Sequence, residues 1–255
     1  MDDFAIKIIA HRGESYIAPE NSLAAINLAW KNGAKAVEID IQLTGDGNVV
    51  VIHDKHTGRV ADRKYTIAKS NLETIKSVDI GIKKAEEYKG EKIPTLSEVL
   101  ETVPNNAKLI IEIKCGNEII RPLKTLVLNS NIRINQIEFI SFNLKVVSKI
   151  KEQLPLYKAL WLLDLDYYWP HWLLRIRPNK IIKIVAKNKL DGVNVWAGKV
   201  INKSFVKAFK ERGLHLYTWT VNDIEFANAL LSMGVNAITT DRAAWLCKRI
   251  NEINK

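Results

Sequence analysis

Residues 36–54 of this 255-residue chain read AVEIDIQLTGDGNVVVIHD. Apolar and polar residues alternate from Ala36 to Leu43, which is the pattern of a β-strand. Glu38 and Asp40 are therefore predicted to project from the same side of that strand. Alternatively, these two acids form the solvated face of an edge strand and carry no function.

The Asp46-Gly47 dipeptide between two β-rich runs predicts a hairpin. If these two residues form the loop, the residue numbers of each facing pair add up to 93, which places His53 opposite Asp40. Cross-strand partners point to the same side of a sheet, so the histidine would join the two acids. A slip of one residue would turn it to the other face.

The composition is that of a globular domain, with 47% hydrophobic and 26% charged residues. At this length we expect one domain over residues 1–255. The N-terminal apolar run is too short for a signal peptide, and no stretch reaches about 18 apolar residues. Cys115 and Cys247 are too few for a disulfide framework. We therefore expect a cytoplasmic protein.

The net charge of +10 would raise the local concentration of anionic ligands. Phosphate esters, nucleic acids and anionic membranes all qualify. The chain has no helix-turn-helix, zinc-finger or RNP pattern, so a nucleic-acid partner is not expected.

Short β-rich runs alternate with amphipathic helical stretches along the chain. The predicted strands are Phe4–Ala10, Ala36–Gln42, Lys108–Lys114, Gln136–Ser141, Tyr157–Leu163, Gly192–Val195, Leu214–Thr220 and Ala237–Thr240. The predicted helices are Ser22–Asn32, Leu96–Val103, Asn117–Leu128, Leu144–Gln153, Lys203–Arg212, Ile224–Met233 and Ala243–Ile253, with a less regular one in 173–188 that Pro178 interrupts. Eight repeats favour an α/β fold of the (β/α)₈ TIM-barrel type, although a doubly wound sheet shares the alternation. Residues 49–53 are predicted as the return arm of the hairpin, and residues 55–92 as a small insertion on one rim.

Barrel enzymes build their sites at the C-terminal ends of the strands, where this sequence gathers polar residues. Glu38, Asp40 and Glu112 converge there if the second and third strands are neighbours. Hard oxygen ligands of this kind suit Mg²⁺ or Ca²⁺. The same acids can also serve as partners of Arg12 and Lys114, and the two roles can coexist.

His11 and His53 are the histidines predicted at strand ends near these acids. A pair of histidines on either side of a scissile bond can act as general base and general acid. Arg12 and Lys114 could bind phosphate oxygens. Together these groups predict phosphodiester cleavage.

Ordered motifs across nearly the whole chain resemble those of the glycerophosphodiester phosphodiesterases. They are HRG (11–13), PENS (19–22), VEIDIQLTGDGNVVVIHD (37–54), IPTLSEVL (93–100), IEIK (111–114), DGVN (191–194), YTWTVND (217–223) and GVNAITTDR (234–242). The resemblance implies a barrel with a small insertion, a divalent cation, and hydrolysis of glycerophosphodiesters such as glycerophosphocholine or glycerophosphoethanolamine to glycerol 3-phosphate and an alcohol. The small-molecule diester is then the expected partner.

The resemblance also implies roles residue by residue. Glu38, Asp40 and Glu112 correspond to metal ligands, His11 and His53 to the acid/base pair, and Arg12 and Lys114 to phosphate-binding residues. Glu20 and Asn21 would line or support the site, and Trp219 would wall the glycerol pocket.

Two other readings stay open. The aromatic and basic stretch at 159–177 suits a membrane interface or an acyl-chain groove, so a lysophospholipase-D-like activity is one alternative, although packing of a fifth strand and its helix explains the stretch better. A non-catalytic barrel that binds phosphate ligands is the other, because fold does not dictate function.

Overall fold

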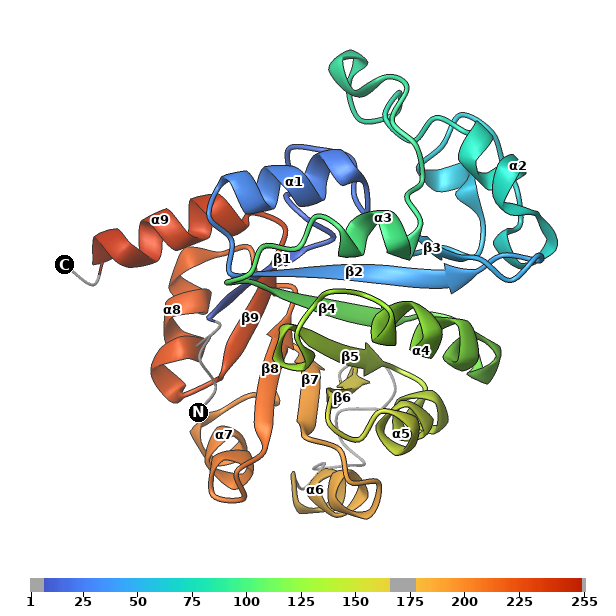
Figure 1. Cartoon of the computed structure of the whole chain (residues 1–255). Helices are drawn as coiled ribbons and strands as arrows, with labels where there is room; N and C mark the ends of the chain where they lie inside the picture. The colour runs from blue at the N-terminus through green and yellow to red at the C-terminus, as the bar shows by residue number, and fades with distance from the viewer. Residues whose placement is uncertain (1–6, 166–177, 254–255) are drawn as a thin grey trace.

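The computed structural model describes residues 7–165 and 178–253. Within these residues, eight parallel strands close into a barrel because β1 pairs with both β9 and β2 (Figure 1). The barrel strands are β1 (Ile8–His11), β2 (Ala36–Leu43), β4 (Lys108–Ile113), β5 (Ile137–Ser141), β6 (Lys158–Leu163), β7 (Gly192–Trp196), β8 (His215–Trp219) and β9 (Ala237–Thr240). The predicted (β/α)₈ barrel is confirmed.

Helices surround the barrel on its outer side (Figure 1). They are α1 (Leu23–Lys31), α3 (Leu96–Leu100), α4 (Ile120–Leu128), α5 (Leu144–Gln153), α6 (Pro178–Lys187), α7 (Lys203–Lys210), α8 (Ile224–Met233) and α9 (Ala243–Ile253). Ser22 caps α1 by accepting a hydrogen bond from Ala25 N, and Thr95 and Glu98 form a capping box on α3. Pro178 is the first described residue of α6, and proline is well tolerated in the first turn of a helix.

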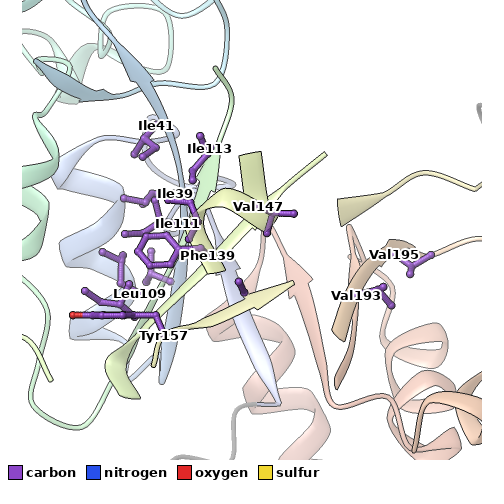
Figure 2. Close-up of a cluster of buried hydrophobic side chains, with 14 of the residues drawn as sticks. Ile39, Ile41, Leu109, Ile111, Ile113, Phe139, Val147, Tyr157, Val193 and Val195 are labelled. Carbon is purple, nitrogen blue, oxygen red and sulfur yellow. The ribbon is translucent and has the colours of Figure 1, made fainter. Parts of the chain in front are cut away.

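The strands bury two sets of apolar side chains on their opposite faces. Ile39 and Ile41 of β2 lie in the large cluster between the barrel and its helices, together with Val147 of α5 (Figure 2). Ile110 of β4 lies in a smaller cluster made of strand residues only, which fills the barrel interior. Because side chains alternate along a strand, the residues next to Ile39 and Ile41 point into the barrel.

The register of the hairpin between β2 and β3 (Val49–Val51) differs from the predicted one. Ile41 faces Val51, so facing positions sum to 92 and not 93. The loop has three residues, 45–47, and Gly47 adopts a left-handed conformation with φ of 85°. A three-residue loop of this kind is one residue longer than the two-residue loop that the Asp46-Gly47 dipeptide suggested.

The prediction that His53 pairs directly with Asp40 is therefore wrong. Ile52 N donates to Asp40 O at 2.9 Å, and the third strand ends before His53. Gln42, which projects from the same face of β2 as Asp40, donates from Nε2 to His53 O at 2.9 Å. This contact places the histidine beside the barrel mouth, although it lies beyond the end of the strand.

Residues 55–92 contain four short helical elements: η1 (Thr57–Arg59), η2 (Ile67–Lys69), α2 (Leu72–Ser77) and η3 (Glu86–Tyr88). The segment leaves the barrel beyond the end of β2 (Figure 1). Its apolar side chains form a separate cluster with β3 that includes Val50, Ile67 and Ile75. The remaining 3₁₀ turns, η4 (Asn117–Ile119) and η5 (Ile134–Gln136), precede α4 and β5.

Some predicted features fall outside the described residues. These are the first part of the first strand (4–6), the start of the irregular helix (173–177), and Tyr167, Tyr168, Trp169 and Trp172 of the aromatic stretch. In the part of the chain that is described, no helix is long and apolar enough to cross a membrane.

Candidate active site

Glu38, Asp40 and Glu112 come together inside the barrel near the C-terminal ends of β2 and β4. The two strands are parallel neighbours, and Asp40 pairs with Glu112 in the ladder. One carboxylate oxygen from each residue lies within 4.8 Å of the other two. All three side chains are buried, and Asp40 is 0% exposed, so they are not the solvated face of an edge strand.

The donor set and its electrostatics fit a divalent cation. Glu38 Oε1 and Asp40 Oδ1 are buried, with no hydrogen-bond partner in the described structure. Burial, followed by the neighbouring carboxylates, raises the pKa of Glu38 well above its usual value and that of Glu112 to about 7. Three buried carboxylates repel one another unless positive charge compensates them. A cation with oxygen preference, such as Mg²⁺ or Ca²⁺, would supply that charge.

Arg12 and Lys114 supply part of the compensation. Arg12 Nε lies 3.0 Å from Asp40 Oδ2, and Lys114 Nζ lies 2.6 Å from Glu112 Oε1 and 3.6 Å from Asp40 Oδ1. Burial works against ionisation of Asp40, but these two positive charges hold its pKa below the usual value. The acids are thus partners of both cationic side chains. Two of their oxygens, Glu38 Oε1 and Asp40 Oδ1, still have no hydrogen-bond partner among the residues described, so they would be available to a cation.

His11, at the end of β1, forms one histidine–aspartate pair. Its Nδ1 lies 2.6 Å from Asp241 Oδ1, and its Nε2 lies 4.0 Å from Glu38 Oε2. Burial opposes ionisation of Asp241, but the hydrogen bond with His11 and a second from Asn222 lower its pKa to about 2. An ionised carboxylate on Nδ1 orients the ring and leaves Nε2 to exchange a proton with a substrate.

His53 forms a second such pair with the residue that follows it. Its Nδ1 lies 2.6 Å from Asp54 Oδ1, and Arg59 Nε donates to Asp54 Oδ2 at 2.6 Å. Arg59 also donates to both carboxylate oxygens of Glu20, at 2.8 and 2.7 Å. Burial lowers the pKa of His53, against the charge of Asp40, which favours the neutral ring.

The predicted residues Glu20 and Asn21 position other groups. Glu20 Oε1 accepts a hydrogen bond from Arg12 Nη1 at 2.8 Å. Asn21 holds Asp40 from two sides, since its Nδ2 donates to Asp40 Oδ2 at 2.8 Å and its Oδ1 accepts from Asp40 N at 3.0 Å. Asn21 and Arg12 are in the left-handed region, with φ of 57° and 56°, an uncommon conformation for residues other than glycine that clusters at functional sites.

Aromatic side chains line the mouth of the barrel across from β2. Trp219, at the end of β8, packs edge-on against Trp196 of β7 and against Phe142, with ring centroids 5.0 and 5.5 Å apart. Lys114 Nζ lies 5.6 Å from the centroid of the Phe142 ring, so this aromatic wall reaches the carboxylate cluster. Only Trp219 was predicted from the sequence.

Sequence reasoning also missed Asp54, Asp241 and Arg59 as parts of the site. Asp241 directly follows the last predicted strand, but no local pattern pairs it with His11, because 230 positions separate the two residues. Asp54 was visible as the last residue of the IHD run, and its proximity to His53 was the available signal. Arg59 lies in a segment without periodic pattern, so nothing in the sequence indicated its direction.

Gly13→Ala is expected to destabilise the fold strongly. Gly13 has φ of 84°, and a Cβ there would lie 2.5 Å from the backbone carbon of Ala25 in α1. Strain and overpacking together should lower the free energy of unfolding by about 2–4 kcal/mol, which urea unfolding can measure. Gly33→Ala is the matched control, because Gly33 has φ of 82° but nothing within 4 Å of an added Cβ. Equal losses in both variants would contradict the packing argument.

Removal of divalent cations is expected to make the stability of the protein fall as pH rises from about 5 to 8. The pKa of Glu112 is about 7 in the fold, against about 4.3 in an unfolded chain. Between these values the folded protein keeps a proton that the unfolded chain has released, so the free energy of unfolding decreases with pH. A thermal melt of chelated protein at each pH measures the trend.

Adding cation back should reverse this loss at pH 8. A ligand present at about 100 times its Kd raises the free energy of unfolding by about 2.7 kcal/mol. For a chain of this size that corresponds to an increase in Tm of roughly 5–10 °C. At pH 5 protons compete for the same carboxylates, so the shift should be smaller. Glu112→Gln should weaken both the fall of stability with pH in the chelated protein and the stabilisation by added cation. Equal shifts at both pH values in the wild-type protein would contradict the assignment.

Comparison with known proteins gives concordant matches over nearly the whole chain. The model of the glycerophosphoryl diester phosphodiesterase family matches residues 11–244. A glycerophosphodiester phosphodiesterase of Caldanaerobacter subterraneus subsp. tengcongensis is 32% identical over 244 residues, which cover 92% of this chain and 93% of the relative. One from Bacillus subtilis is 27% identical, covering 92% and 83%. The structure of an Oleispira antarctica phosphodiesterase in complex with the product sn-glycerol-3-phosphate superposes with a TM-score of 0.85 and 28% identity over 96% of each chain.

Proposed function

Because the chain belongs to the glycerophosphoryl diester phosphodiesterase family, and is a glycerophosphodiester phosphodiesterase, we propose that it hydrolyses diesters such as glycerophosphocholine and glycerophosphoethanolamine to glycerol 3-phosphate and an alcohol. The observation that carries this proposal is a buried three-carboxylate cluster accompanied at the barrel mouth by two histidine–aspartate pairs. Glu38, Asp40 and Glu112 would hold Mg²⁺ or Ca²⁺. When bound, such an ion supplies a Lewis acid to the phosphoryl oxygens.

The cationic side chains of the site bind and orient the phosphate. Arg12 and Lys114 lie against Asp40, so a non-bridging phosphate oxygen placed beside that carboxylate meets both positive charges. Positive groups of this kind stabilise the transition state most where its negative charge develops, because the surrounding protein holds them in place before the reaction. Asn21 and Glu20 keep this arrangement rigid through their bonds to Asp40 and Arg12.

The two histidines move the protons. One ring takes the proton of the attacking group, which is water or the neighbouring glycerol hydroxyl, and the other gives a proton to the departing alcohol oxygen. Asp54 and Asp241 accept from the Nδ1 atoms, so each Nε2 is the atom that exchanges a proton with the reactants. Trp196 and Trp219, packed against each other, form an apolar wall for the glycerol carbons.

Product analysis tests this function. Purified protein with a divalent cation should convert glycerophosphocholine to glycerol 3-phosphate and choline. ³¹P NMR measures the conversion. Lysophosphatidylcholine should be a poor substrate; preferential cleavage of it would favour the lysophospholipase-D-like alternative. Binding of glycerol 3-phosphate by calorimetry, with no turnover of any diester, would identify a binding barrel instead.

A further inference from the structure

A cavity of about 680 Å³ opens beside His53, between the carboxylate cluster and the 55–92 segment. It shares Gln42, His53 and Lys114 with the active site, so a molecule bound at the carboxylates can extend into it. Trp196 and Trp219 of the aromatic wall lie across the barrel from this cavity, because β7 and β2 occupy opposite positions in the ring of strands and β8 is next to β7. We call this cavity the basic pocket.

The lining of the basic pocket is strongly cationic. It contains six lysine and arginine side chains and two carboxylates: Lys55, Arg59, Arg63, Lys64, Lys83 and Lys114 against Asp54 and Asp62. Both carboxylates already have partners inside the pocket. Asp54 binds His53 and Arg59, and Asp62 lies 3.4 Å from Arg63.

Lys64 and Lys83 both lie beside Gly58 in this lining. Lys83 Nζ donates to Gly58 O, while the aliphatic stem of Lys64 passes Gly58 so closely that a Cβ there would lie 3.0 Å from Lys64 Cγ. Neither ammonium, nor that of Lys55, lies in an ion pair with a carboxylate of the described residues. Positive charges that line a cavity without ion-pair partners favour an anionic ligand.

We infer that the basic pocket receives the alcohol half of the diester and selects alcohols that carry a second phosphate group. This inference rests on the proposed function, which places the scissile phosphate beside Arg12 and Lys114 and the glycerol at the aromatic wall. Hydrolysis forms a bond from the water oxygen to phosphorus and breaks the bond from phosphorus to the alcohol oxygen, which takes up a proton. The second phosphate keeps all its bonds and binds Lys64 and Lys83.

Two substrates that differ only by that phosphate test the inference. These are glycerophosphoglycerol and glycerophosphoglycerol with a phosphate on its terminal hydroxyl. The wild-type kcat/KM should be about tenfold higher for the phosphorylated diester, as expected for charge-assisted hydrogen bonds, and the preference should shrink at about 0.5 M salt. The double variant Lys64→Gln, Lys83→Gln should bring the ratio of the two kcat/KM values close to one.

The control is the double variant Lys207→Gln, Lys210→Gln on α7, which removes two positive charges outside the pocket. Its ratio of the two kcat/KM values should equal that of the wild type. Hydrolysis of both substrates at equal kcat/KM by the wild type would overturn the inference and leave the proposed function standing. A ratio that persists in the Lys64, Lys83 variant would overturn it too. Absence of turnover with both substrates and with glycerophosphocholine would remove the proposed function and this inference with it.

Discussion

His53→Ala is expected to lower kcat for glycerophosphodiester hydrolysis by about 10²- to 10⁴-fold, the usual contribution of a positioned general acid or base. The side chain is 31% exposed, and its ring nitrogen pairs with Asp54 at the barrel mouth. Its removal therefore takes no apolar packing from the core, and the fold should remain intact. Steady-state kinetics together with a thermal melt separate lost chemistry from lost structure.

A histidine elsewhere in the chain provides the control. His215 begins β8, at the end of the barrel opposite the carboxylate cluster, so His215→Gln should keep near-normal turnover. Near-normal turnover of His53→Ala would remove His53 from the acid/base pair. A loss of kcat with an unchanged melt, by contrast, supports its role in proton transfer.

Glu112→Gln is expected to produce the second large loss. The substitution keeps the shape of the side chain but removes one of the three carboxylates that lie within 4.8 Å of one another. We expect the cation concentration needed for half-maximal activity to rise, and kcat to fall by at least about 10²-fold, because Lewis-acid assistance is worth several kcal/mol. Lys114 loses its 2.6 Å ion pair as well, which weakens phosphate binding.

A titration of activity against added cation measures this effect directly. Glu211→Gln, which changes an exposed glutamate at the end of α7, is the control and should match the wild-type curve. An unchanged half-maximal cation concentration in Glu112→Gln would exclude Glu112 as a ligand.

The sequence predicted the parts of the site that depend on local alternation and on strand order. Glu38 and Asp40 share a face because they are two positions apart in one strand, and Glu112 meets them because the next barrel strand pairs alongside. The barrel and the family resemblance were confirmed. These features follow from the 2-residue strand period and from the repeated β/α alternation, both of which are visible without tertiary contacts.

Features that depend on loop geometry were not predictable in the same way. The hairpin register was wrong by one residue, since the Asp46-Gly47 dipeptide suits both a two-residue and a three-residue loop. Asp241 reaches His11 only when the barrel closes and brings β9 beside β1. Arg59 reaches Glu20 and Asp54 from an irregular segment, where no period indicates the direction of a side chain.

The central claim is that the buried carboxylates hold a cation on which hydrolysis depends. Release of glycerol 3-phosphate from glycerophosphocholine by wild-type protein, before chelation, after chelation, and after Mg²⁺ or Ca²⁺ is restored, tests it most directly. We predict that chelation abolishes release and that the added cation restores it, with one choline formed for each glycerol 3-phosphate. Undiminished release from protein shown by elemental analysis to be free of metal would contradict the claim.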